Sequence, residues 1–406
     1  MKTYTDRLLR TITMTNKNAF KEGQFILDTL ESNGFEAYYV GGSVRDYCMG
    51  KSVGDIDITT NALPKQIEAL FKHTIDVGIE HGTIVVVINK TPYEVTTYRT
   101  ETTYSDFRRP DSVEFTTSLK EDLARRDFTM NAIAMDKHFK LYDPYDGQSA
   151  IEDKEIITVG NPDERFNEDA LRMLRALRFM SQLQFDLNED SYNAIKKLVS
   201  NVQHISVERI VQELKKLYKG INIEASKRLL IESDMYKYIP FFNRVGKDDL
   251  KKSVVHTLNN EIIIQLLFND SVSFKNELKL SNEDKKYINT SIQLYDDLKN
   301  KLETVIVAYK YDTMLLKNML KILSDNSALN INMEDDLLEA IQKKESLTIQ
   351  SKKDLAVNGN DLMNSLNKRG GPWLKELLDE IERQILFETL PNDFDAIIEW
   401  VHNEYH

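Results

Sequence analysis

The sequence has almost no cysteine, which excludes two kinds of stabilising site. Its 406 residues contain a single cysteine, Cys48. One thiol forms no internal disulfide, and it cannot supply a zinc site built from several thiolates. Any metal ion bound by this protein should therefore take oxygen ligands.

Long apolar runs are also missing. The longest purely aliphatic stretch is Ile84–Ile88, far short of the ~20 residues that a membrane-spanning helix requires. The first residues of the chain carry charges where a secretory signal would have its apolar centre. We therefore expect no membrane contact and place the protein in the cytoplasm.

Positive charge is not in excess. The chain has 65 acidic and 53 basic residues, a net charge of −12, which argues against a protein that coats nucleic acid through bulk charge. Only local basic surfaces could hold RNA or DNA. One candidate surface, which could equally be a solvated helix face, comprises Lys215, Lys216, Lys219, Lys227 and Arg228.

Glycine and proline become scarce beyond residue 162, and the chain changes character there. Ten of the 15 glycines lie at or before Gly160. The same part holds short β-type runs bounded by turn residues, at 37–40, 56–60, 84–88, 94–99 and 113–117. Apolar residues then recur at helical spacing. We expect an α+β head followed by helices, with breaks near residues 152, 210 and 310.

The run 37–40 leads into Gly41-Gly42 and then into a short predicted helix that ends near Gly50. Glycines without a Cβ let a phosphate approach the backbone, and Arg45 one turn into the helix adds a forked positive charge. This geometry is typical of a phosphate cradle. The alternative is an ordinary strand-turn-helix junction.

Paired carboxylates follow ten residues later. Asp55 and Asp57 share one face of a predicted strand, while Ile56 and Ile58 point into the core. Two such carboxylates repel unless a cation lies between them, so the pair can bind divalent ions. Glu94 is the best candidate for a third carboxylate. A solvated strand face is the alternative.

A predicted helix over 168–179 carries a polar stripe beside a stripe of apolar residues. Steps of three residues place Asp169, Arg172, Arg175 and Arg178 on the polar stripe. This stripe could be a row of stabilising Asp–Arg pairs or a working surface. Arg125 and Arg126 form a basic pair that leads into a probable helix, and on the pattern alone they read as a helix start with exposed arginines.

The order of these motifs resembles a known family. The run GGSVRDYCMGKSVGDIDITT looks like the signature of polymerase-β-like nucleotidyltransferases, in particular of the bacterial class II tRNA nucleotidyltransferases, the CCA-adding enzymes. Further segments match in order at 77–83, 125–132, 143–147, 168–172 and 206–210, with a weaker echo at 354–359 and 371–374. The resemblance implies a polymerase-β-like head over 1–152, a helical neck over 153–210, a body over 211–310 and a tail over 311–406.

The resemblance also implies roles for the site residues. Asp55 and Asp57 would hold Mg²⁺, with Glu94 as the further catalytic carboxylate. Gly42 and Arg45 would orient the triphosphate. Arg126 would contact the bound nucleotide, and Asp127 and Asn131 would place its ribose. Asp169 and Arg172 would select the base. Arg175 and Arg178 would either support that pair or hold the triphosphate.

Base selection has a chemical rationale. Cytosine and adenine both present an amino donor next to a ring-nitrogen acceptor, whereas uracil and guanine present an oxygen where that amino group would be. A carboxylate beside a guanidinium therefore admits C and A and rejects U and G.

The implied activity is addition of CCA to the 3′ end of tRNA from CTP and ATP, with release of pyrophosphate in a two-metal reaction. tRNA would be the partner, and a homodimer is left open. Alternatives are a CC-adding enzyme, a bacterial poly(A) polymerase, a nucleotidyltransferase with a non-RNA acceptor, or an inactive RNA-binding protein. The connection 99–115 looks intact, which favours the CCA-adding branch, because it is shortened in CC-adding relatives.

Overall fold

The computed structural model describes residues 19–101, 113–269, 271–329 and 333–404. The chain divides into two compact units. The first comprises residues 1–244 and 277–279, and the second comprises residues 245–276 and 280–406. The centre of the connection 99–115 lies outside the described residues. Within the described ranges, no helix is both long enough and apolar enough to cross a membrane.

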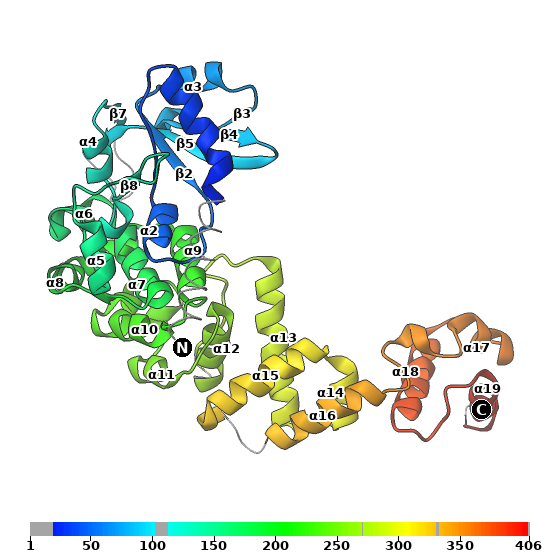
Figure 1. Cartoon of the computed structure of the whole chain (residues 1–406). Helices are drawn as coiled ribbons and strands as arrows, with labels where there is room; N and C mark the ends of the chain where they lie inside the picture. The colour runs from blue at the N-terminus through cyan, green and yellow to red at the C-terminus, as the bar shows by residue number, and fades with distance from the viewer. Residues whose placement is uncertain (1–18, 102–112, 270, 330–332, 405–406) are drawn as a thin grey trace, which may run out of the picture. The chain divides into compact units, whose positions relative to one another are not determined.

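The first unit contains a seven-stranded sheet of order β3-β4-β5-β2-β1-β8-β9 (Figure 1). Its strands are β1 (Ala37–Val40), β2 (Asp57–Thr60), β3 (Thr74–Gly78), β4 (Thr83–Ile88), β5 (Thr91–Thr97), β8 (Ala134–Met135) and β9 (Leu141–Tyr142). β2 runs parallel to β5 and antiparallel to β1. Two small sheets pair β6 (Arg99–Glu101) with β7 (Val113–Phe115) and β10 (Glu155–Ile156) with β11 (Asp186–Leu187).

The two faces of the sheet belong to different apolar clusters. On β1, Ala37 and Tyr39 pack into one cluster, whereas Val40 belongs to the other, as the two-residue period of a strand requires. The first cluster also takes side chains from the helix over 19–32 and from α3 (Pro64–Leu70). The second takes Leu119 and Leu123 of α4 (Leu119–Ala124).

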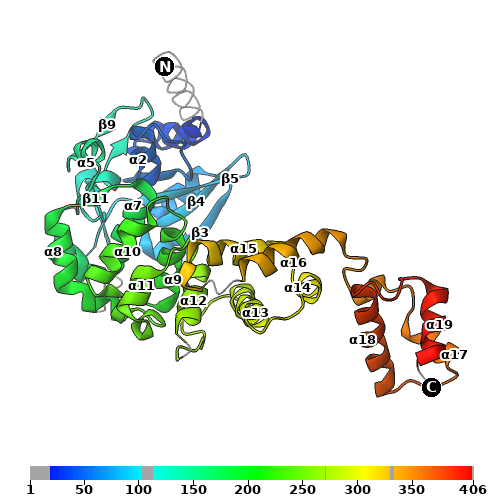
Figure 2. The ribbon, with the colours of Figure 1, turned by 90° about the horizontal axis from the view of Figure 1, so that it is seen from below.

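Helices complete the first unit. They are α2 (Gly42–Cys48), α5 (Gly147–Asp153), α6 (Pro162–Glu168), α7 (Leu171–Leu183), α8 (Glu189–Leu198), α9 (Val207–Leu217) and α10 (Ile223–Glu232). α7 packs against α9 and α10, and the three lie beside one another in both views of the ribbon (Figure 2). Most of α7 is buried, including Arg172 and Arg178. A helix surrounded in this way carries its charged groups into the interior of the unit.

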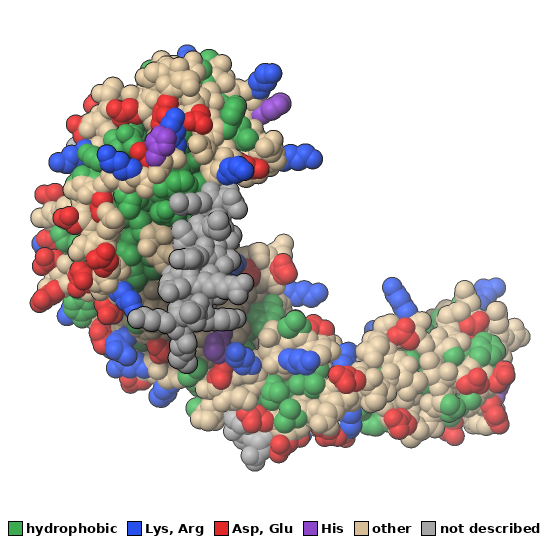
Figure 3. Space-filling view, in the orientation of Figure 1, with side chains coloured by type: hydrophobic (Ala, Val, Ile, Leu, Met, Phe, Trp, Pro, Cys, Tyr) green, Lys and Arg blue, Asp and Glu red, His purple; other side chains and the backbone are tan. Residues whose placement is uncertain are grey.

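The described residues of the second unit form helices joined by loops, with no strand among them. Its helices are α11 (Lys247–Lys252), α12 (Leu258–Phe268), α13 (Asn282–Lys299), α14 (Thr304–Lys310), α15 (Thr313–Asp325), α16 (Glu334–Ser346), α17 (Gly359–Ser365), α18 (Pro372–Leu386) and α19 (Phe394–Glu404). An apolar cluster joins α17, α18 and α19. On the face shown in Figure 3, acidic and basic side chains are interspersed over these helices.

The predicted α+β class is confirmed, and each of the five predicted strand runs overlaps a strand. Two sequence interpretations were wrong. The helix predicted from Glu168 is interrupted, because Asp169 ends α6 in an extended conformation and α7 begins at Leu171. Lys227, assigned to a basic or solvated surface, is only 2% exposed within α10, so it cannot face RNA phosphates.

Candidate active site

A cavity of about 930 Å³ lies in the first unit, between the sheet and α7. Of the twelve site residues predicted from the sequence, eleven line it. Asp55 is the exception: it is exposed and precedes the first residue of β2 by two positions. The fold therefore brings residues from 42 to 178 along the chain to one chamber.

Gly41, which has no side chain, leaves space next to the Asp57 carboxylate and the Arg126 guanidinium. Gly41 precedes α2 with φ +74°, a backbone region that L residues rarely adopt. A Cβ at this position would lie 3.3 Å from Asp57 Oδ2 and 3.3 Å from Arg126 Nη1. Gly41 thus lies directly against a carboxylate and a guanidinium, and a side chain here would fill the space next to both.

Asp57 and Glu94 face each other across two parallel strands. They are register partners on β2 and β5, and both line the cavity. Burial and the nearby Glu94 carboxylate raise the pKa of Asp57 to about 6, with Arg126 opposing and Asp55 adding to the shift. Ionised carboxylates held this close call for a compensating positive charge.

Asp55 and Asp57 fit a divalent cation that takes its remaining ligands from a bound nucleotide. In the described part of the chain, no group of three His, Cys, Asp or Glu side chains is arranged to hold a metal ion by itself. Mg²⁺ in nucleotide sites takes one or two carboxylates together with phosphate oxygens. Asp57, which is half-buried, and Asp55, which is exposed just upstream, are carboxylates of that kind.

Asp127 is the centre of a buried hydrogen-bond chain. Its Oδ2 accepts hydrogen bonds from Arg175 at 2.7 and 2.6 Å, and its Oδ1 accepts from the Asn131 amide at 3.0 Å. The Asn131 carbonyl in turn accepts from Arg45 Nη1 at 2.8 Å. Burial disfavours the charged form, but Arg175, the Asn131 amide and the Phe128 N–H together lower the pKa of Asp127 to about 2.

Arg125 and Arg126 share a buried carboxylate that sequence reasoning did not identify. Asp122 is fully buried in α4, 2.9 Å from Arg125 Nη2 and 3.6 Å from Arg126 Nη2. The Arg126 side chain is only 17% exposed, so the alternative of a helix start with exposed arginines does not describe it. Despite its burial, these two arginines hold the pKa of Asp122 below its usual range.

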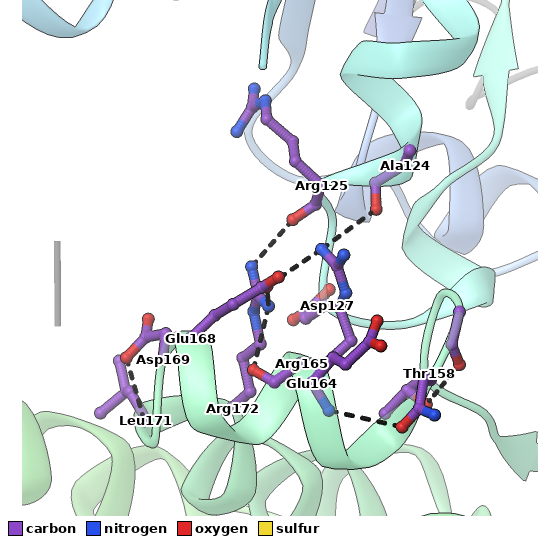
Figure 4. A network of polar contacts seen from close by, with 12 residues as sticks. Ala124, Arg125, Asp127, Thr158, Glu164, Arg165, Glu168, Asp169, Leu171 and Arg172 are labelled. Carbon is purple, nitrogen blue, oxygen red and sulfur yellow. Dashed lines mark hydrogen bonds and ion pairs between the residues drawn. The ribbon is translucent and has the colours of Figure 1, made fainter. Parts of the chain in front are cut away.

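Asp169 and Arg172 both line the cavity, but each is held by a different partner (Figure 4). Arg172 donates to Glu168 at 2.6 Å and to the backbone carbonyls of Arg165 at 3.0 Å and Arg125 at 2.9 Å. Asp169 accepts from the Leu171 N–H at 3.0 Å, as seen in Figure 4. These contacts fix both side chains at the junction of α6 and α7.

Asp169 has a further partner on another helix. Its Oδ2 lies 3.1 Å from Nη2 of Arg209, on α9. Arg178, on α7, lies 3.1 Å from Glu213, which like Arg209 belongs to α9. Burial and the nearby Arg175 lower the pKa of Arg178 to about 10. α9 thus supplies counter-charges to both ends of the polar stripe.

Sequence reasoning assigned no role to Glu168, Arg209 or Glu213. Glu168 and Arg209 lie inside segments that match the family in order, so their positions carried a signal that was not used. Glu213 lies beyond those segments, on an amphipathic helix where an acidic residue looks solvated. Its burial, at 6% exposure, follows only from the packing of α9 on α7.

Three family models match parts of this chain. The family model of the Poly A polymerase head domain matches residues 37–157. Models described as a probable RNA and SrmB-binding site of polymerase A, and as tRNA nucleotidyltransferase domain 2, match residues 184–245 and 261–401.

Individual relatives extend the match to nearly the whole chain. A CCA-adding enzyme of Staphylococcus aureus strain Mu3 is 44% identical over 398 residues, which cover 96% of this chain and 99% of the relative. The crystal structure of the Bacillus stearothermophilus CCA-adding enzyme in complex with CTP superposes with a TM-score of 0.82 at 35% identity, covering 95% of this chain and 97% of that one.

A more distant structure shares the fold. The Thermotoga maritima CCA-adding enzyme complexed with tRNA superposes with a TM-score of 0.67 at 18% identity, over 98% of each chain. Together with the head domain and the cavity-lining motifs, the identity over 96% of the sequence shows that this chain belongs to the CCA-adding enzymes and is a tRNA nucleotidyltransferase.

Proposed function

We propose that this protein adds C, C and A in turn to the 3′ end of tRNA, using CTP and ATP and releasing pyrophosphate. The observation that carries this proposal is that Asp57, Glu94, Asp169 and Arg172 line one cavity together with further arginines. Carboxylates for phosphoryl chemistry and a carboxylate–guanidinium pair for base selection are thus within reach of one nucleotide.

The metal requirement is proposed as Mg²⁺ held by Asp55 and Asp57. Both carry hard oxygen ligands, and triphosphate oxygens would complete the coordination. Bound there, one or two such ions would neutralise charge on the triphosphate and acidify the attacking hydroxyl.

The transfer step is an in-line displacement. The 3′-hydroxyl oxygen of the tRNA attacks the α-phosphorus and forms a new O–P bond. The bond between the α-phosphorus and the oxygen that bridges it to the β-phosphorus breaks, so that pyrophosphate leaves. Glu94 would receive the hydroxyl proton; its register pairing with Asp57 and its position in the cavity lining support this role. Arg45 and Arg126 would bind the nucleotide through their forked donors.

Base selection is assigned to Asp169 and Arg172. Asp169 would accept a hydrogen bond from the amino group of C or A, and Arg172 would donate one to the adjacent ring nitrogen. Discrimination of this kind requires donors and acceptors that cannot swing toward a wrong base. The Glu168 and Arg209 contacts described above supply that restraint.

The remaining assignments follow from composition and family. The helical second unit would bind the tRNA body, and the single cysteine is compatible with a reducing cytoplasm.

The test uses the purified protein and a tRNA that lacks its last three nucleotides. With Mg²⁺ and all four nucleoside triphosphates present, sequencing of the 3′ ends should show growth by CCA and then arrest. A stop at CC, a run of A, or no extension would each contradict the proposal and would indicate a CC-adding enzyme, a poly(A) polymerase or a non-RNA acceptor.

Two variants test the site assignment in the same assay. Asp57→Asn should abolish transfer while tRNA binding, measured by filter retention, stays near the wild-type value. Glu68→Gln, which changes an exposed carboxylate on α3 of the same unit, should extend tRNA normally. Turnover retained in Asp57→Asn would refute the metal assignment.

A further inference from the structure

Three arginines of the cavity gather around one aromatic ring. Phe179 lies on α7, lines the cavity and is 4% exposed. The guanidinium carbons of Arg178, Arg45 and Arg175 lie over its ring at 4.2, 5.3 and 5.4 Å from the centroid. We call Arg45, Arg175 and Arg178 the arginine cluster.

Like charges at this spacing repel, so the arginine cluster needs stabilising partners. Each member has polar partners: Asp46 and the Asn131 side-chain carbonyl for Arg45, Asp127 for Arg175 and Glu213 for Arg178. The members also share the Phe179 ring. The face of an aromatic ring carries partial negative charge and attracts cations, most strongly where water is excluded.

The polar partners also connect the members. Arg45, Asn131, Asp127 and Arg175 form one continuous hydrogen-bond chain, and the Phe179 ring contacts the arginine at each end of it. The ring itself is held edge-to-face by Phe128, with centroids 5.8 Å apart and an interplanar angle of 89°. The two arginines are therefore tied together both by polar contacts and through an aromatic ring of fixed orientation.

We propose that Phe179 is a positioning residue that holds the arginine cluster in place, through cation–π contacts, to receive the triphosphate of the incoming nucleotide. The inference rests on the proposed function only for the identity of that ligand. Phe179 acts through the arginines and touches neither the base nor the reacting phosphorus. Its contribution is to preorganise the arginine side chains before the nucleotide arrives, so that less freedom is lost on binding.

The first test replaces the ring by an aliphatic side chain. Phe179→Leu should raise KM for CTP and for ATP alike, by roughly tenfold given the usual strength of desolvated cation–π contacts. It should leave kcat and the preference for CTP over UTP close to wild type, because Asp57 and Asp169 are not among the contacts of the ring. Phe179→Tyr, which keeps the aromatic face, should restore KM.

The second test separates the electrostatics of the ring from its packing. Site-specific replacement of Phe179 by mono-, di- and trifluorophenylalanine weakens the negative face while largely preserving the shape of the ring. Calorimetric titration with inorganic tripolyphosphate, without tRNA or metal, should show affinity falling stepwise along this series. The matched control is the same series at Phe20, which is 1% exposed and packs among aromatic rings of the head, and tripolyphosphate affinity should not change there.

The outcomes are distinct from those that test the function. Tripolyphosphate affinity that is unchanged by fluorination at Phe179, or lowered equally at Phe20, would overturn the proposal, as would a Phe179→Leu variant that folds and keeps the wild-type KM. Failure of the wild-type protein to extend tRNA would instead refute the proposed function, and the tripolyphosphate titration would still decide the role of Phe179.

Discussion

Gly41→Ala should reduce activity by displacing side chains of the site. Gly34→Ala serves as the control, because it strains the backbone without displacing them. Gly41 has φ +74° and lies within 3.3 Å, measured from an ideal Cβ, of both Asp57 Oδ2 and Arg126 Nη1. Gly34 has φ +84°, but a Cβ there would meet nothing within 4 Å. Both positions have a positive φ, so both substitutions strain the backbone, and only Gly41→Ala also displaces side chains of the site.

The two effects have different magnitudes and different readouts. A residue forced into this backbone region costs about 1–3 kcal/mol, and each kcal/mol lowers the melting temperature of a unit of this size by about 2–4 °C. In Gly41→Ala the methyl group must also push the Asp57 carboxylate or the Arg126 guanidinium aside by a few tenths of an ångström. Because displacements of about 1 Å can cost ~100-fold in rate, we expect a loss of roughly 10-fold or more in single-turnover nucleotide transfer.

The assay compares melting temperature and single-turnover tRNA extension for wild type, Gly34→Ala and Gly41→Ala. Both variants should melt at lower temperature, whereas only Gly41→Ala should lose transfer. Wild-type transfer by Gly41→Ala, or an equal loss in Gly34→Ala, would show that the contact with Asp57 and Arg126 does not govern the reaction.

Other predictions follow from individual contacts. Arg209→Gln should loosen Asp169 and lower the preference for CTP over UTP by roughly 3- to 10-fold, the equivalent of one partly exposed charged hydrogen bond; competition assays with both nucleotides measure it. Asp127→Asn should destabilise the protein at pH 7 by roughly 2–3 kcal/mol. Since the folded pKa of Asp127 is depressed to about 2, this stabilisation is present above pH ~4 and is lost as the pH falls toward 2; urea unfolding at several pH values tests it. Burial and Asp143 raise the pKa of Cys48 to about 11, so iodoacetamide at pH 8 should modify the native thiol roughly 100-fold more slowly than an unperturbed one, as followed by mass spectrometry.

Controls or contradicting results can be stated for each of these predictions. Arg228→Gln changes an exposed arginine of α10 and should leave nucleotide preference unchanged, so an equal effect there would contradict the role of Arg209. A pH profile of Asp127→Asn parallel to that of wild type between pH 4 and 2 would contradict the low pKa. For Cys48, the protein unfolded in guanidinium chloride should react at the rate of a free thiol, and equal rates in both states would contradict a protected native thiol.

Local patterns in the sequence were sufficient for much of the head. Runs of β-branched and aromatic residues between turn residues located β1, β2, β4, β5 and β7 but not β3, β8 or β9, because side-chain alternation and turn chemistry act over a few positions. The glycine pair before α2 was found for the same reason. The continuous helix expected from Glu168 failed at Asp169, because the turn there is held by contacts with Leu171 and with Arg209, which lies 40 positions away.

The site itself was only partly predictable. Residue type and spacing identified Asp57, Asp169 and Arg172 as candidates, and order along the chain connected them to one family. The partners of the cavity arginines were not foreseeable, because Asp122, Glu213 and Phe179 look like ordinary surface or core residues in the sequence. Burial made them partners, and burial depends on which helix packs on which.

The sequence by itself determined the α+β head, the helical remainder and the chemistry that the polar residues can perform, because these depend on composition, periodicity and residue type. The tertiary structure alone decided that residues from 42 to 178 line one cavity, that Asp169 pairs with Arg209, and that three arginines share the ring of Phe179. Contacts of this kind join segments that are remote along the chain, and it is packing, with the desolvation that accompanies it, that sets which charges meet and how strongly they interact.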